Sequence, residues 1–114
     1  MKKDNYGRII NIISTSVKQP LPNLGVSNTI RAAVANWAKT MANELGAFGI
    51  TVNNVLPGAT DTNRMKAIIA NRVDKTGWTE DLVKEEILRE IPMKRFARPE
   101  EVAVAVAFLA SPAA

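Results

Sequence analysis

The chain has 114 residues, a formal net charge of +4 and neither Cys nor His. Without Cys there is no disulfide, thiolate metal site or cysteine nucleophile, and without His the chain forms no Ser-His-Asp triad or ordinary zinc site. Its Lys and Arg residues are scattered among Asp and Glu, whereas a nucleic-acid binder concentrates them. No apolar run is long enough to cross a bilayer, so we expect a cytoplasmic protein without membrane or nucleic-acid partners.

The first predicted element is a strand over residues 8–13. Its run of Ile does not alternate with polar residues, which is typical of a strand buried on both faces. Residues 14–26 carry two prolines and a glycine, a composition that predicts a loop.

A long helix is predicted over residues 27–45, because apolar residues recur there at steps of three and four and form one stripe. We expect Ser27 or Asn28 to cap its start and Gly46 to end it in the left-handed conformation. A second buried-type strand is predicted over residues 49–56, where Pro57-Gly58 stops it. Strand, helix and strand together make a βαβ unit.

Three further helices are predicted. One follows a polar loop within residues 59–77 and is broken by Gly77. The next covers residues 80–91 and is capped by Thr79. The last opens with Pro99 and is apolar nearly all round, so we expect it to have neighbours on more than one side.

The two strands are too few for a closed α/β domain, since buried parallel strands need sheet neighbours and helices on both faces. The sequence therefore predicts an α/β fold that is part of a doubly wound parallel sheet, with a βαβ unit and carboxyl-terminal helices. We expect residues 1–114 to form a single partial domain that lacks the amino-terminal half.

Several segments resemble one known family in order and spacing. They are GRIINIIS, then GITVNNVLPG with a Thr five places after the Pro, and the tail IPMKRFARPEEVAVAVAFLAS. Together they resemble the carboxyl half of the short-chain dehydrogenase/reductases, and in style the 3-oxoacyl-acyl-carrier-protein reductases. The resemblance implies a Rossmann fold, NADP or NAD as cofactor, hydride transfer, a carbonyl or hydroxyl small-molecule substrate and a homo-oligomer. The family's Gly-rich phosphate turn is not in this sequence, so we expect a fragment.

The resemblance assigns catalytic positions to Ser14, Ser27 and Arg31. Ser14 matches the family serine that polarises the substrate carbonyl, where negative charge develops. Ser27 and Arg31 stand where the family has a proton-donating Tyr and, four residues later, a Lys that binds the cofactor ribose. An alkyl hydroxyl is a far poorer acid than a phenol, so we expect impaired catalysis. Ser27 is alternatively only a helix cap.

The resemblance also implies a cofactor site. Arg31 keeps the positive charge at the Lys position and is expected to contact a ribose or phosphate. Pro57 and Gly58 match the turn that approaches the nicotinamide, where glycine allows close contact with backbone. Thr60 and Thr62 match positions that contact its carboxamide and the phosphates.

Other residues of similar chemistry are given no catalytic role. Asn53 matches a family asparagine that we interpret as structural, and the acidic residues around 80–86 fit a solvated helix face better than a metal site. Tyr6 precedes the first strand, whereas α/β sites lie beyond the carboxyl ends of strands, so it is expected on the wrong side to replace the missing Tyr.

Two functions of different class remain open. The first is an NAD(P)(H)-dependent oxidoreductase with impaired catalysis. The second is a non-catalytic assembly module that self-associates through the amphipathic helix, with Trp37 and Met41 as contact residues, and through the nearly all-apolar last helix.

Overall fold

The computed structural model describes all residues from Met1 to Ala114. The chain divides into two compact units: Met1–Gly58 with Ala103–Ala114, and Ala59–Val102. The first unit contains the sheet and the second contains a pair of helices. Helix α4 (Pro99–Ala110) begins in the second unit and ends in the first.

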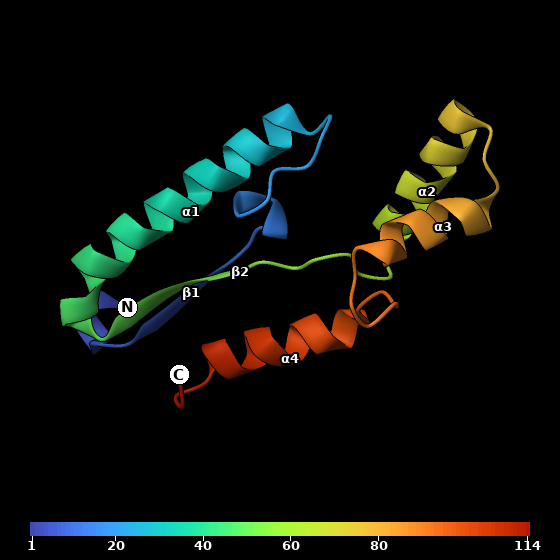
Figure 1. Cartoon of the computed structure of the whole chain (residues 1–114). Coiled ribbons are helices and arrows are strands. Elements are labelled where there is room, and N and C mark those ends of the chain that lie inside the picture. The colour runs from blue at the N-terminus through green and yellow to red at the C-terminus, as the bar shows by residue number, and fades with distance from the viewer. The chain divides into compact units, whose positions relative to one another are not determined.

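A βαβ arrangement forms the first unit, as predicted. Strands β1 (Gly7–Ile12) and β2 (Ile50–Val55) pair in parallel, with Gly7 opposite Ile50 and Ile12 opposite Val55. Helix α1 (Gly25–Leu45) connects them and lies along the sheet, as Figure 1 shows. The α/β class and the partial parallel sheet are therefore confirmed.

An amide pair joins the two strands to the helix. Asn11 and Asn54 face each other in the strand pairing, and Asn11 Nδ2 donates to Asn54 Oδ1 at 3.0 Å. Asn54 Nδ2 reaches the carbonyl oxygen of Ala35 in α1 at 3.5 Å. The core of this unit is small; its buried apolar residues are Ile13, Ala38, Leu45 and Ile50.

The predicted start of the long helix is wrong. Its predicted end at Leu45, with Gly46 as the next residue, is confirmed, but the left-handed conformation expected of Gly46 is wrong. The helix begins at Gly25, and Ser27 and Asn28 already lie inside it. Their side chains bond elsewhere: the Ser27 hydroxyl accepts from Arg31, and Asn28 Nδ2 donates to a loop carbonyl. At the other end Gly46 is right-handed, with φ of −56°. The chain continues through a 3₁₀ turn, and Gly49 is the left-handed residue, with φ of +64°. Because of this extra turn, the chain changes direction toward β2 at Gly49 and not at Gly46.

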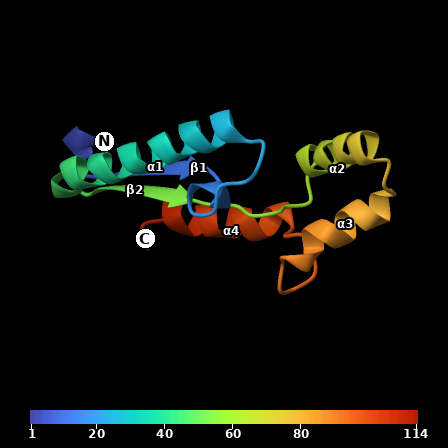
Figure 2. The same cartoon turned by 45° about the horizontal axis from the view of Figure 1, so that its top comes forward.

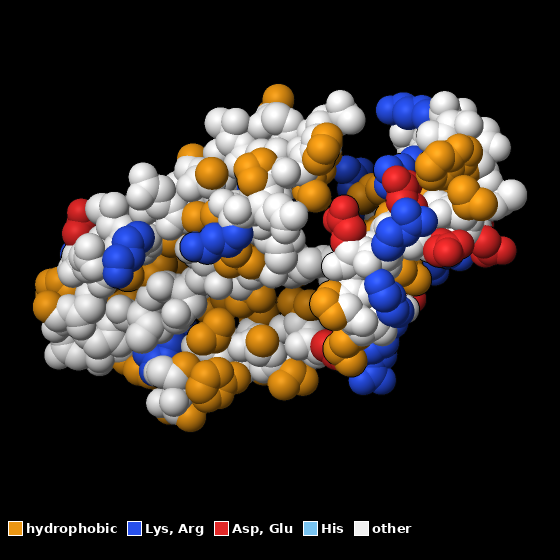
Figure 3. All heavy atoms as spheres, in the orientation of Figure 1, with side chains coloured by type: hydrophobic (Ala, Val, Ile, Leu, Met, Phe, Trp, Pro, Cys, Tyr) orange, Lys and Arg blue, Asp and Glu red, His pale blue; other side chains and the backbone are white.

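The last part of α4 lies on the side of the two strands opposite to α1 (Figure 2). Arg8 joins it to β1, since Arg8 Nε donates to the carbonyl oxygen of Ser111 at 3.2 Å. No residue of α4 is buried, and Val104 and Phe108 are 70% and 57% exposed. Within the single chain this helix therefore lacks the neighbours on several sides that its sequence predicts, because a two-stranded sheet offers too little surface to cover an all-apolar helix. Hydrophobic side chains are visible along it in Figure 3.

The second unit is built on helices α2 (Asn63–Thr76) and α3 (Glu80–Arg89). The pair buries Ile69 and Val83. Thr79 caps α3 by accepting from the Leu82 amide, and α2 ends before Gly77, both as predicted. Gly77 adopts the left-handed conformation, which the sequence analysis did not specify. Lys, Arg, Asp and Glu side chains are mixed over these helices in Figure 3.

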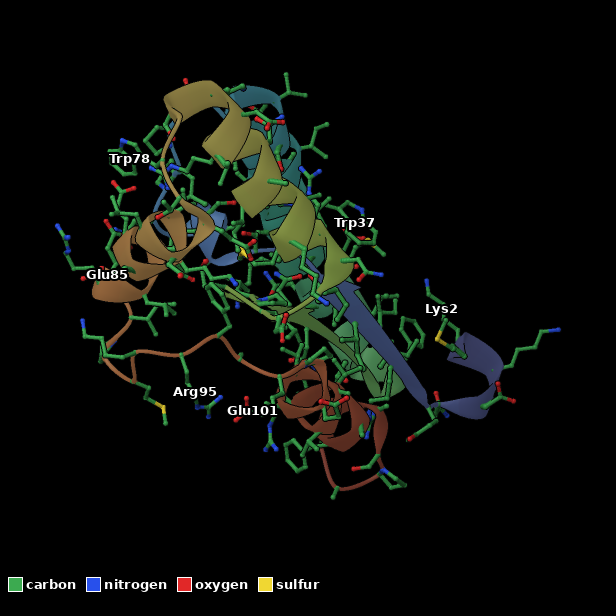
Figure 4. The ribbon with its side chains drawn as sticks, turned by 90° about the vertical axis from the view of Figure 1, so that its right-hand side faces the viewer. Lys2, Trp37, Trp78, Glu85, Arg95 and Glu101 are labelled. Atoms are coloured by element: carbon green, nitrogen blue, oxygen red, sulfur yellow. The ribbon has the colours of Figure 1, made fainter.

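The two ends of the second unit are joined to each other. The Ala97 amide donates to Ala59 at 3.0 Å, and the Asp61 amide donates to Ala97 at 2.8 Å, which makes a short parallel bridge. Close by in sequence, the carboxylate of Glu101 bonds the guanidinium of Arg95, and Figure 4 shows these two side chains side by side. The segments that precede α2 and α4 are therefore held together.

None of these helices combines the length and the apolar character needed to cross a membrane.

Candidate active site

The carboxyl ends of β1 and β2 bring two of the predicted site segments together. The Ile13 amide donates to Val55 at 2.9 Å, and the Thr15 amide donates to Pro57 at 3.2 Å. Ser14 thus lies beside the Pro57-Gly58 turn. In α/β sheets, ligands bind at this end of the strands.

Ser14 is half-buried at the end of β1 and has an extended backbone, with φ of −167°. Its hydroxyl oxygen accepts from the Ser16 amide at 3.1 Å and so caps a 3₁₀ turn at Thr15–Val17. That contact uses a lone pair and leaves the hydroxyl hydrogen available. Ser14 can therefore donate a hydrogen bond to a substrate oxygen while it caps the turn.

Ser27 and Arg31 lie one turn apart on α1 and bond each other. Arg31 Nε donates to Ser27 Oγ at 3.3 Å, and Arg31 Nη1 donates to the carbonyl oxygen of Ile13 at 2.7 Å. The helix spacing of four residues places both side chains on one face. This face turns toward the end of β1, so Arg31 links the helix to the residue that precedes Ser14.

Ser27 and Arg31 also line a broad, mostly apolar hollow of about 1090 Å³ between β1 and the first turns of α1. Ile10, Ile30 and Val34 contribute to its apolar wall. Ser14, Pro57 and Gly58 are not among the residues that line it. The predicted catalytic residues are thus near one another in the chain's tertiary structure without lining one cavity.

Thr60 and Thr62 belong to the second unit. The Thr62 hydroxyl accepts from the Met65 amide at 3.3 Å and donates to the Thr60 carbonyl at a long 3.4 Å. Thr62 is therefore the N-cap of α2, and both hydrogen-bonding functions of its hydroxyl are used. A threonine immediately before a helix is itself a capping signal, and it is present in the sequence at Thr62 beside the family motif.

Other residues missed from the sequence are Asn11 and Asn54. Only their neighbour Asn53 was singled out, yet Asn54 makes the bonds across the sheet and to α1. The signal was present, since an Asn in a buried-type strand needs a partner. Tyr6 stands before the amino end of β1, where its ring stacks on the Arg8 guanidinium at 4.5 Å, as its position in the sequence predicted.

The acidic residues of α3 act as surface ion pairs. Lys84 Nζ lies 2.6 Å from Glu80 Oε1, and this contact lowers the pKa of Glu80 and raises the pKa of Lys84. No group of three or more Asp and Glu is placed to hold a metal ion.

Comparisons with known proteins agree with this geometry. The sequence model of the family described as enoyl-(acyl carrier protein) reductase matches residues 1–114. A solved structure of a short chain dehydrogenase family protein from Francisella tularensis superposes with a TM-score of 0.87 at 30% identity, over 92% of this chain and 43% of the other. The chain belongs to the short-chain dehydrogenase/reductase family.

Two curated relatives of this short-chain dehydrogenase/reductase are similar over nearly its whole length. The NADPH-dependent reductase BacG of Bacillus subtilis is 37% identical over 97% of this chain and 43% of the relative. A 3-oxoacyl-[acyl-carrier-protein] reductase of Synechocystis is 42% identical over 97% of this chain and 39% of the relative. The chain thus spans about two fifths of the length of these relatives, and the expected match to the carboxyl-terminal part of the family is confirmed.

The donor set of this chain fits a nicotinamide cofactor and its substrate in part. Ser14 has a hydroxyl hydrogen to donate, and Pro57-Gly58 presents backbone beside it. A Cβ built on Gly58 meets only a Thr15 methyl, at 3.9 Å, so the turn is not crowded. Arg31 and Thr62 fit less well, because each already bonds to the protein.

Proposed function

We propose that this chain carries part of the site of an NAD(P)(H)-dependent oxidoreductase that acts on a carbonyl or hydroxyl carbon, as 3-oxoacyl-acyl-carrier-protein reductases do. The observation that carries the proposal is the place of Ser14: it ends β1 beside the Pro57-Gly58 turn and keeps a hydrogen to donate. The names of the similar reductases support the class of reaction and the cofactor.

The bound cofactor supplies or accepts the hydride. In this proposal Ser14 donates a hydrogen bond to the substrate oxygen, and its donor is most valuable when that oxygen becomes an alkoxide. Pro57 and Gly58 offer backbone to the nicotinamide edge. Thr60 and Thr62 are proposed to lie near the cofactor as well, Thr62 through its backbone, since its hydroxyl caps α2.

Proton transfer is the weak step of the proposed reaction. Ser27 holds the position from which the family donates the proton, and its oxygen accepts from Arg31. A nearby cation favours the alkoxide form, but the ordinary alcohol pKa lies far above that of a phenol. We propose that the chain therefore turns over slowly or not at all.

The test is reduction of an acetoacetyl thioester by the pure chain, followed by the loss of NADPH absorbance. We expect little activity, which Ser14→Ala abolishes and the control Thr40→Ala, an exposed hydroxyl of α1, leaves unchanged. The double change Ser27→Tyr with Arg31→Lys restores the family pair and is expected to raise turnover. Fast turnover that is insensitive to Ser14→Ala contradicts the proposal.

A second candidate function is self-association, which the exposed apolar side chains favour. Val26, Ile30 and Trp37 of α1 are 78%, 58% and 48% exposed, and α4 exposes Val104 and Phe108. Exposed apolar patches of this kind mark association surfaces. Light scattering separates the candidates: a homo-oligomer that Trp37→Glu dissociates supports assembly, and a monomer at micromolar concentration contradicts it.

The expected location in the cytoplasm stays a prediction.

A further inference from the structure

The shortest hydrogen bond of Arg31 goes to a backbone carbonyl at the end of β1. Arg31 Nη1 lies 2.7 Å from the carbonyl oxygen of Ile13. A neutral N–H···O bond is typically about 2.9–3.0 Å long, and bonds from a charged donor are shorter and roughly twice as strong. The bond also joins residues 18 positions apart, so it is a tertiary contact between α1 and the end of β1.

Ile13 directly precedes Ser14 and is still hydrogen-bonded to β2. Its side chain is buried, at 7% exposed, and its amide donates to Val55 in β2. In the parallel pattern that joins Ile13 to Val55 and Thr15 to Pro57, the carbonyl of Ile13 would accept from the amide of residue 57. That residue is a proline and has no N–H, so the carbonyl has no backbone partner in the neighbouring segment. Arg31 supplies the partner of this carbonyl, and a part-buried carbonyl without one is costly.

The peptide group that carries this carbonyl also carries the amide of Ser14. A bond that fixes the carbonyl therefore fixes the orientation of the peptide plane and, through it, the direction in which the Ser14 side chain leaves the backbone. Ser14 is extended, with φ of −167° and ψ of 153°, and the next amide, of Thr15, bonds Pro57.

We propose that Arg31 is a positioning residue, which holds the end of β1 through the Ile13 carbonyl and so places Ser14. This proposal rests on the proposed function, in which Ser14 is the residue that touches substrate. In this proposal Arg31 joins α1 to the end of β1, although the family resemblance implies a residue that binds the cofactor at this position.

The chemistry of arginine suits this role better than that of lysine. The guanidinium presents five N–H donors in a rigid fork, whereas an ammonium is a point charge on a flexible stem. Arg31 uses two arms of that fork at once, Nε on Ser27 and Nη1 on Ile13. The bond to Ser27, on the same helix, holds the fork in the direction of β1.

The experiment follows the Ile13 carbonyl by ¹³C NMR in the full chain, without cofactor. We compare wild type with Arg31→Met, Arg31→Lys and a control, Lys39→Met, which removes an exposed cation from the same helix. Loss of the bond is expected to move the Ile13 carbonyl signal upfield in Arg31→Met and to a lesser degree in Arg31→Lys. Lys39→Met is expected to leave it in place.

Amide exchange and NADPH titration complete the test. We expect the Thr15 amide to exchange about ten- to a hundredfold faster in Arg31→Met, the range that loss of a hydrogen bond to a charged group implies, and Arg31→Lys to recover part of it. An Arg31→Met protein with unchanged Ile13 and Thr15 signals but lost NADPH binding overturns the proposal. So does a wild-type Ile13 carbonyl at its random-coil position. A wild type that binds no NADPH while the Ile13 signal responds contradicts only the proposed function.

Discussion

Glu101 and Arg95 form a bidentate ion pair at the start of α4. Arg95 Nη1 donates to Glu101 Oε2 at 2.8 Å, and Arg95 Nη2 donates to Glu101 Oε1 at 2.7 Å. The Arg98 amide donates to the same carboxylate at 2.6 Å. Glu101 is the third residue of the helix and Arg98 precedes it, so the glutamate also performs one half of a capping box.

This pairing makes the stability of the chain depend on pH. The hydrogen bond from Arg95 and then that from Arg98 lower the pKa of Glu101 to about 2, from an ordinary value of 4.5. A carboxylate with a lowered folded pKa stabilises above its unfolded pKa, and that contribution is lost as pH falls toward the folded value. We expect the Tm of wild type to exceed that of Glu101→Gln above about pH 5, and the two to converge between about pH 4.5 and pH 2.

The adjacent Glu100 provides a matched control, since it has the same charge and is exposed. Glu100→Gln is expected to show no such convergence in thermal melts followed by circular dichroism. A constant gap between wild type and Glu101→Gln across the whole acid range would mean that the ion pair adds nothing to folding.

Two glycines before β2 respond in opposite ways to alanine. Gly49 has φ of +64°, and a Cβ on it would strike the carbonyl oxygen of Asn5, so Gly49→Ala is expected to destabilise by roughly 1–3 kcal/mol or more. Gly46 is right-handed with open space around it, so Gly46→Ala is expected to leave stability unchanged or raise it by about 0.4–1 kcal/mol. Urea unfolding of both variants measures the difference. Equal effects would place the left-handed residue elsewhere.

The asparagine pair of the sheet should be sensitive to removal of one partner. Asn54→Ala leaves the Asn11 amide without its acceptor, which is expected to cost about 1–3 kcal/mol in the free energy of unfolding. Asn53→Ala is the control, because no hydrogen bond of its side chain is seen in the structure. The double change Asn11→Val with Asn54→Val is expected to cost less than the sum of the single changes. Additive losses would contradict a direct bond between the two amides.

Thr62 separates a capping role from a cofactor role. Thr62→Ala removes the bond to the Met65 amide and is expected to destabilise α2 by about 1 kcal/mol, whereas Thr62→Ser keeps the cap. The helical signal in circular dichroism, read without cofactor, reports the difference. If Thr62→Ala leaves helicity intact and weakens only NADPH binding, the hydroxyl serves the cofactor and not the helix.

The sequence predicted those features that depend on local pattern. The Ile-rich run before Ser14 and the stripe along α1 were sufficient for the βαβ unit, because burial imposes those patterns directly. It misplaced the start of α1, since a serine inside a helix has the same local sequence as a serine that caps one. The bond of Arg31 to Ile13 could not be predicted, because it depends on how a helix lies on a strand.

The same limit applies to the second unit. Its caps at Thr79 and Gly77 were foreseen from the residue types, but the pairing of Ala97 with Ala59 and Asp61 joins distant segments whose sequences carry no mark of it. The family resemblance gave residues and their order, and it was correct for the fold. It did not predict that the Thr62 hydroxyl caps α2, and the cofactor role that it implies for Thr62 stays a prediction.

The bridge between Ala97 and Ala59 has a consequence for how this part of the chain tolerates change. The segments before α2 and before α4 are hydrogen-bonded to each other, so α2 and α3 lie in a loop whose two ends are already held together. Lengthening a closed loop adds little entropy cost, since each doubling costs only about 0.6 kcal/mol. The α2–α3 region can therefore gain or lose residues without moving the point at which α4 begins.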